Sequence, residues 1–221
     1  AAELGITAAT EFLGFIPVPD LPAFYRSCHA FVLPSTDARR EGFGLVLLDA
    51  HPDLFDTYDG SKLTSPCPMR RALEGSRLKP EHLLILGTRS YNPVELDFMR
   101  EKGIRFVPAR EIDRLGVESV VTLARQKLNG VGNVYVSLDI DVADPSCAPG
   151  TGAPVAAGLT SRQLIELTRG LAKSLPVRAM DIVEIAPALD ASGITLFLAL
   201  QIVFETFAVL AEKRRPSRSA S

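Results

Sequence analysis

A short apolar run that ends in three closely spaced polar residues constrains this chain more than any other part of its sequence. The run Leu45–Leu48 is followed by Asp49, His51 and Asp53. If the run is a strand, its alternation places these three side chains on one side as the chain leaves the sheet. A run of this length also permits a buried helix.

A second apolar segment, Val134–Ile140, carries Asp139 and Asp141 in the same alternating pattern. Two such strand ends side by side form a carboxylate-rich site with one imidazole, a donor set that suits divalent cations such as manganese. We expect pairing with this segment to hold Leu45–Leu48 as a strand, because a central parallel strand is buried on both faces.

The alternation of expected strands and helices predicts a mainly parallel sheet covered on both faces, which is a three-layer α/β/α fold. Asn92 and Pro93 are typical of a helix start, and Gly103 of its end. Thr160 with Gln163 predicts a capping box for a helix through Ser174. Further strands are expected at Leu83–Gly87, Ile104–Val107 and Val177–Ile185, and further helices at Met69–Gly75, Ala109–Leu115, Val117–Asn129 and Ile194–Lys213.

The charge balance gives no reason to expect a nucleic-acid or membrane partner, since 24 Lys and Arg face 26 Asp and Glu in 221 residues. Apolar runs such as Ile194–Val203 are short or interrupted for a bilayer span, and the amino end lacks a signal-peptide core. We therefore predict a cytoplasmic protein. Cys28, Cys67 and Cys147 are widely spaced and odd in number, which predicts reduced thiols.

Several motifs resemble those of the ureohydrolases, the family of arginase, agmatinase and formiminoglutamase. They are D-A-H-x-D from Asp49, S-L-D-I-D-V-x-D-P from Ser137, A-P-G-T-G-x-P from Ala148 and D-I-V-E-I-A-P from Asp181. The resemblance covers about Val46 to Lys213 and implies an arginase-like α/β fold.

The resemblance also implies a chemistry, in which a hydroxide held between two manganese ions attacks a guanidinium carbon and releases urea and an amine. Glu184 matches the residue that accepts hydrogen bonds from the guanidinium. The substrate expected is a small guanidino compound such as agmatine, arginine or a guanidino acid. The implied metal ligands are Asp49 and Asp139 as bridges, His51 and Asp141 on one ion, and Asp53 on the other.

Two elements of the ureohydrolase pattern are absent from the sequence. The family supplies a further histidine ligand from a G-G-D-H-S motif, which the first 45 residues replace, and neither His29 nor His82 matches it. We therefore expect the ion served by Asp53 to be held weakly. Ser65 stands where many relatives carry a proton-shuttling histidine, and a serine does not titrate near pH 7.

Residues 1 to about 49 resemble instead the nucleotide-sugar-binding domain of retaining glycosyltransferases, through E-F-L-G-F-I-P from Glu11 and E-G-F-G-L-V-L-L from Glu41. In that family the second motif begins a helix. We infer a fusion, with residues 1–45 as a Rossmann-like fragment packed into the same domain, 46–213 as the ureohydrolase-like region and 214–221 as a loose tail. The fragment is expected to contain strands at Thr10–Ile16 and Ala30–Leu33 and a helix from Asp20 to Ser27.

Alternative interpretations remain at this point. One is an active hydrolase that forms a homo-oligomer like its relatives, and another is an inactive metal-binding or structural remnant. A glycosyl-transfer module using Glu41 is a third possibility. Asp144-Pro145 and the glycines at 150 and 152 favour turns, the latter because no lysine follows as in a phosphate loop. Asp181 favours a structural role.

Overall fold

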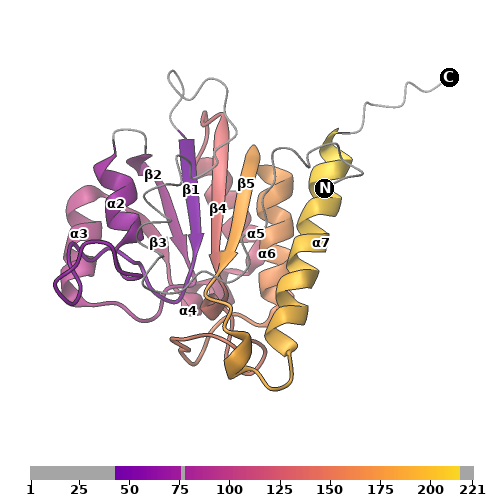
Figure 1. Cartoon of the computed structure of the whole chain (residues 1–221). Coiled ribbons are helices and arrows are strands. Elements are labelled where there is room, and N and C mark those ends of the chain that lie inside the picture. Colours follow the sequence, from indigo (N-terminus) through magenta and orange to yellow (C-terminus); the bar gives the residue numbers. More distant parts are fainter. Residues whose placement is uncertain (1–42, 76–77, 215–221) are drawn as a thin grey trace, which may run out of the picture. The chain divides into compact units, whose positions relative to one another are not determined.

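A parallel sheet forms the centre of the fold (Figure 1). The computed structural model describes residues 43–75 and 78–214. The sheet has five strands in the order β3-β2-β1-β4-β5, and every neighbouring pair is parallel. The strands are β1 (Phe43–Leu48), β2 (Leu78–Leu86), β3 (Arg105–Val107), β4 (Asn133–Asp139) and β5 (Val177–Val183).

Strand β1 shows why the sheet is covered on both faces. Leu45 and Leu47 belong to a buried cluster on one face, with side chains of two helices, and Val46 and Leu48 belong to the larger cluster on the other. The predicted strand at Leu45–Leu48 is confirmed, and the helical alternative is wrong, because this segment pairs with both β2 and β4. The helices are α2 (Pro68–Glu74) and α3 (Pro93–Lys102) on the first face, and α4 (Ala109–Leu115), α5 (Val117–Lys127), α6 (Ser161–Ser174) and α7 (Ile194–Arg214) on the second.

The helix boundaries follow the expected capping residues. Asn92 and Glu95 form a capping box at the start of α3, and Gly103 ends it in the left-handed conformation. Thr160 and Gln163 form the predicted capping box of α6. These capping residues confirm the predicted starts of α3 and α6 and the predicted end of α3.

The order of the strands creates a topological switch point between β1 and β4. From β1 the chain adds β2 and β3 on one side, and then crosses to add β4 and β5 on the other. Ligands of open α/β sheets bind at the carboxyl ends of the strands at such a point. Leu48 is paired with Leu138, so the next residues, Asp49 and Asp139, leave adjacent strands at this edge.

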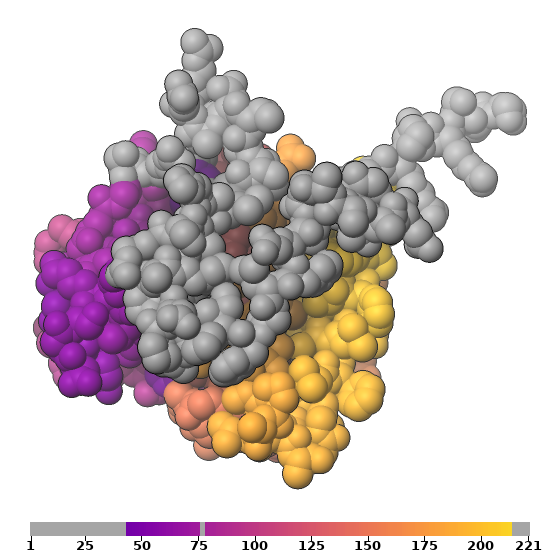
Figure 2. Space-filling view, viewed as in Figure 1, coloured from indigo at the N-terminus to yellow at the C-terminus, as the bar shows by residue number. Residues whose placement is uncertain are grey.

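Helix α7 is long and apolar enough, by length and composition, to cross a membrane, and it is the one such helix in the described part of the chain. The run Ile194–Val203, expected from the sequence to be short or interrupted for a span, is part of this longer apolar helix, and that expectation is corrected. One side of α7, including Leu198 and Ile202, is buried in the core, whereas Phe197 and Phe204 are exposed. Part of this helix surface, in yellow, faces the viewer in Figure 2.

Several predictions fall on residues outside the described ranges. These are the two strands and the helix expected before residue 43, the tail after residue 214, and the positions of His29 and Cys28. Cys67 and Cys147, which are described, are free thiols as predicted.

Candidate metal and active site

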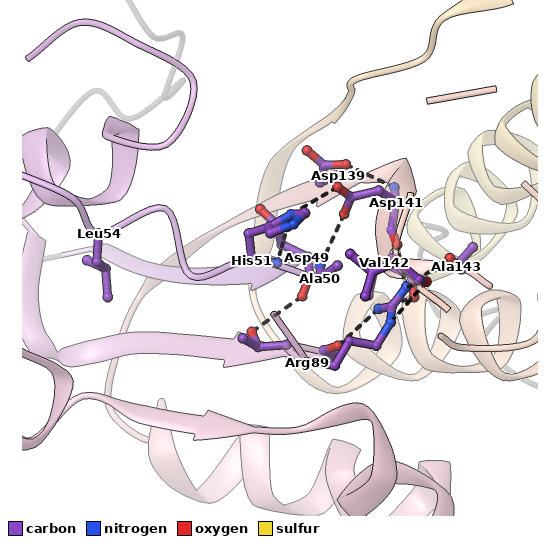
Figure 3. A network of polar contacts seen from close by, with 12 residues as sticks. Asp49, Ala50, His51, Leu54, Arg89, Asp139, Asp141, Val142 and Ala143 are labelled. Carbon is purple, nitrogen blue, oxygen red and sulfur yellow. Dashed lines mark hydrogen bonds and ion pairs between the residues drawn. The ribbon is translucent and has the colours of Figure 1, made fainter. Parts of the chain in front are cut away.

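The loop after β1 brings an imidazole into an acidic pocket. Asp49 is only 1 % exposed, and its Oδ1 accepts a hydrogen bond of 2.6 Å from the backbone N–H of His51. The His51 Nδ1 lies 3.5 Å from this Oδ1 and 3.1 Å from Oδ2 of Asp141 (Figure 3). The two predicted motifs therefore meet, although 90 residues separate Asp49 from Asp139 in the sequence.

The loop after β4 is a short 3-10 helix, Ile140–Val142, that turns its carboxylates toward the first loop. Asp139 caps this helix by accepting a hydrogen bond of 2.9 Å from the backbone N–H of Asp141. Asp141 in turn accepts a bond of 3.1 Å from the backbone N–H of Ala50. The side chain of Asp141 is thus bound to the first loop as well as to its own.

Three of the predicted metal ligands form one cluster. Ligand atoms of Asp49, His51 and Asp141 all lie within 4.8 Å of one another. Divalent cations take ligand distances of about 2.0–2.6 Å, so small side-chain movements bring all three atoms onto one ion. Asp53 and Asp139 do not belong to this cluster but lie beside it, since the negative charge of Asp49 affects the pKa of both.

The electrostatics of this cluster favour a cation. Burial, with repulsion from Asp141, raises the pKa of Asp49 to about 7 although the His51 contact opposes it. Burial and then the charge of Asp49 raise the pKa of Asp53 and of Asp139. Hydrogen bonds to Asp141 and then Asp49 raise the pKa of His51 to about 10. Buried carboxylates without a cation are costly, and the residues present therefore fit the metal that the fold implies.

Asp53 has a strained backbone and is anchored by a buried acid that the sequence analysis missed. Its φ is 55°, which is uncommon for a residue other than glycine. The following residue, Leu54, donates its N–H to Glu95 at 3.0 Å, and Glu95 is 2 % exposed. The signal was in the sequence, since Glu95 stands at the third position of α3 after Asn92, where a capping box places its carboxylate.

Glu184 lies apart from the cluster, at the end of β5. It is exposed and has a φ of 60°. A Cβ built on Gly152 would lie 3.8 Å from the Glu184 carboxylate, so the A-P-G-T-G segment lies beside it. The backbone N–H of Ala186 also donates to the carbonyl of Gly150 at 2.8 Å. These two motifs therefore form a second, more exposed half of the candidate site.

The structure supports turn or structural roles for other acids. Asp181 accepts hydrogen bonds from Tyr135 and, at 2.8 Å, from Ser137, which joins β5 to β4. Asp144 accepts the backbone N–H groups of Ser146 and Gly158 in a turn, as predicted.

Neither Ser65 nor His82, the described residues discussed as departures from the family pattern, belongs to the metal cluster. Ser65 lies in an exposed part of the loop before α2. His82 lies within β2, four positions before its end, and its Nδ1 is buried without a hydrogen-bond partner among the described residues.

Comparison with known proteins decides the family. The model of the "Arginase family" matches residues 21–208. The chain belongs to the arginase family. This family match begins upstream of the boundary expected near Val46, within the segment for which the sequence suggested a glycosyltransferase origin.

Relatives with known names share this arginase-family core. The chain is 40% identical over 197 residues to guanidinopropionase of Pseudomonas aeruginosa, covering 87% of this chain and 61% of that protein. Proclavaminate amidino hydrolase from Streptomyces clavuligerus, a solved structure, is 37% identical to this chain with a TM-score of 0.72, over 77% of this chain and 56% of that one. Arginase from Bacillus caldovelox is 31% identical with a TM-score of 0.72, over 81% and 64%. The chain spans roughly half to three fifths of the length of the curated relatives it matches.

Proposed function

We propose that this protein hydrolyses the C–N bond of a linear guanidino compound and releases urea. The observation that carries the proposal is the convergence of Asp49, His51 and Asp141 at the switch point of the sheet. Glu184 directly follows β5, the strand that pairs with β4, and supplies a carboxylate for the guanidinium.

The residues divide into two tasks. Asp49, His51 and Asp141, with Asp139 and Asp53 beside them, hold divalent cations, for which manganese is the proposed metal. Such cations, when bound, lower the pKa of water and provide a nucleophile at neutral pH. The planar guanidinium matches a carboxylate in shape and charge, so Glu184 orients the carbon to be attacked. Without the histidine of G-G-D-H-S, a cation at Asp53 would be held more weakly than one at the cluster of Asp49, His51 and Asp141.

The substrate class follows from the names of the relatives together with the exposed carboxylate. They include guanidinopropionase, guanidinobutyrase and agmatinase, whose named compounds share a linear guanidino group. We propose a guanidino acid as the first candidate, because guanidinopropionase is 40% identical to this chain.

A urea-release assay tests the proposal directly. The full chain is incubated with MnCl2 and separately with 3-guanidinopropionate, 4-guanidinobutyrate, agmatine or arginine. Urea is expected from at least one of them, and Asp139→Ala is expected to abolish it. Manganese binding without urea from any compound would contradict the proposal and support the inactive metal-binding alternative.

The expectations about localisation, partners and the first 45 residues stay proposals. We propose a cytoplasmic protein that binds neither nucleic acid nor membrane and that forms a homo-oligomer. We also propose that its first 45 residues derive from a glycosyltransferase. Calorimetry with a sugar nucleotide tests whether any donor binding survives, and absence of heat would exclude a glycosyl-transfer function.

A further inference from the structure

The two loops of the metal cluster follow different strands. A residue that belongs to neither loop, Arg89, makes hydrogen bonds to both of them. We propose that Arg89, which follows β2, is a positioning residue that holds the Asp49–His51 loop and the Asp139–Asp141 loop at the separation that cations require. This inference rests on the proposed function only in that the cluster binds metal. It does not require turnover.

The side chain of Arg89 is bound to the second loop (Figure 3). Its guanidinium donates to backbone carbonyls of three segments: the end of β2, the turn after Asp139, and a more distant loop. All of these contacts are to main-chain oxygen, so they depend on the path of the backbone. The acceptors are Gly87 (3.2 Å), Asp141 (2.8 Å), Val142 (3.2 Å), Ala143 (3.2 Å), Val155 (2.6 and 3.3 Å) and Ala156 (3.1 Å).

The backbone of Arg89 is bound to the first loop. Its N–H donates to the carbonyl of Ala50 at 2.9 Å, and the N–H of Ser90 donates to the same oxygen at 3.0 Å. Ala50 lies between Asp49 and His51, and its own N–H donates to Asp141. A single residue therefore connects the main chain of both ligand loops.

Two glycines leave room for this arrangement. A Cβ on Gly158 would lie 2.5 Å from a guanidinium nitrogen of Arg89 and 2.6 Å from the carbonyl carbon of Ala143. A Cβ on Gly87, whose φ is 92°, would lie 2.3 Å from a side-chain methyl of Val142. The guanidinium thus lies in a fitted site between loops rather than on an open surface.

The chemistry of arginine explains why another cation would not serve. The guanidinium has five N–H donors in one plane, whereas a lysine ammonium has three donors around a point and cannot reach carbonyls on three sides at once. Burial lowers the pKa of Arg89, and the nearby Asp141 opposes this, so the side chain remains a cation close to the acidic cluster.

The test is manganese affinity in Arg89→Lys and Arg89→Met, measured by isothermal titration and by the electron paramagnetic resonance spectrum of Mn²⁺. Residues that orient metal ligands typically contribute about 10- to 100-fold to affinity. We expect a loss of this size in both variants, with an altered Mn²⁺ spectrum in Arg89→Lys and an unchanged far-ultraviolet dichroism spectrum.

The matched control is Arg169→Lys, because Arg169 contacts Glu205 between α6 and α7 and lies outside the cluster. It is expected to lower the melting temperature without changing manganese affinity. If Arg89→Met does not fold, Arg89→Lys and Gly158→Ala carry the test. Wild-type affinity and spectrum in Arg89→Lys would overturn the proposal, as would failure of the wild-type protein to bind Mn²⁺. Manganese binding without urea release would remove the proposed function alone.

Discussion

The candidate site has two halves that are built differently. The metal half, after β1 and β4, consists of buried acids with shifted pKa values, and a hydrogen bond from the backbone N–H of Ala50 to the Asp141 carboxylate joins its loops. The substrate half, named for the role we propose for it, presents an exposed carboxylate, Glu184, just beyond the end of the edge strand β5. The comparison teaches that hydrogen bonding between loops goes with burial in the first half, whereas the carboxylate of the second half is exposed to solvent.

The largest effect is expected in the metal half, from Asp141→Asn. The amide still accepts the N–H of Ala50, but it removes the charge that faces His51. Manganese affinity is expected to fall by at least about 100-fold, more than for residues that only orient ligands, and urea release to fall with it. Titration calorimetry measures the first quantity.

Asp181→Asn is the control for that variant. This aspartate joins Tyr135 and Ser137 across β4 and β5, so its replacement should lower stability while manganese affinity stays the same. An equal loss of affinity in both variants would show that the distinction between ligand and structural acid is wrong.

In the substrate half, Glu184→Gln is expected to separate turnover from metal binding. A hydrogen bond to a charged group contributes about 1.5–3 kcal/mol, so kcat/KM should fall by roughly 10- to 150-fold. Manganese affinity and melting temperature should not change, because the side chain is exposed and lies outside the cluster. Glu118→Gln, an exposed glutamate on α5, should be silent in all three measurements.

The pH dependence of stability should test the metal half without any mutation. The pKa of Asp49 is raised from 3.8 to about 7 and that of His51 from 6.5 to about 10, so both groups bind more protons in the folded chain. In protein stripped by a chelator, their stabilising contributions are present at low pH and are lost as pH rises from about 4 to 7 for Asp49 and from about 6.5 to 10 for His51.

Metal binding requires those protons to leave, so its affinity should rise with pH, about tenfold per unit for each proton released. Thermal melts with and without MnCl2 at pH 6 and pH 8.5 should therefore show a larger stabilisation at the higher pH. An equal stabilisation at both values would contradict the shifted pKa values.

The smallest effect is expected at Asp190, which anchors the start of α7 behind the substrate half. Its carboxylate accepts the N–H groups of Ser192, Gly193 and Thr195, and contacts led by Ser192 lower its pKa to about 2. Asp190→Asn should lower the melting temperature by a few degrees at pH 7. The difference in melting temperature between wild type and variant should shrink as pH falls from about 4 to 2, because the ionised Asp190 stabilises the fold only above these pKa values. An undiminished difference at pH 2 would contradict this role of the Asp190 charge.

Much of the fold and the carboxylates of the metal half could be predicted from the sequence, because the signals for them are local. Asn92 and Thr160 each start a helix with their own side chain, and the alternation after Leu48 places the carboxylates at a strand end. The choice of strand over helix at Leu45–Leu48 depended on the expected pairing with β4, and the structure has this pairing.

What the sequence did not reveal is how distant segments support one another. Arg89 carries no motif in the sequence analysis, because its acceptors are main-chain oxygens in three segments. The apolar length of α7 was also missed, since Glu205 interrupts the hydropathy run while pairing with Arg169. The role of Arg89 depends on tertiary contacts, whereas the apolar length of α7 follows from its length and composition.

The central claim is that the ends of β1 and β4 hold a cation between them. Crystals of the full chain grown with MnCl2 and measured at the manganese absorption edge test it most directly. We expect an anomalous difference peak bounded by Asp49, His51 and Asp141. A chain that binds no manganese at this position, or binds it only elsewhere, would contradict the account.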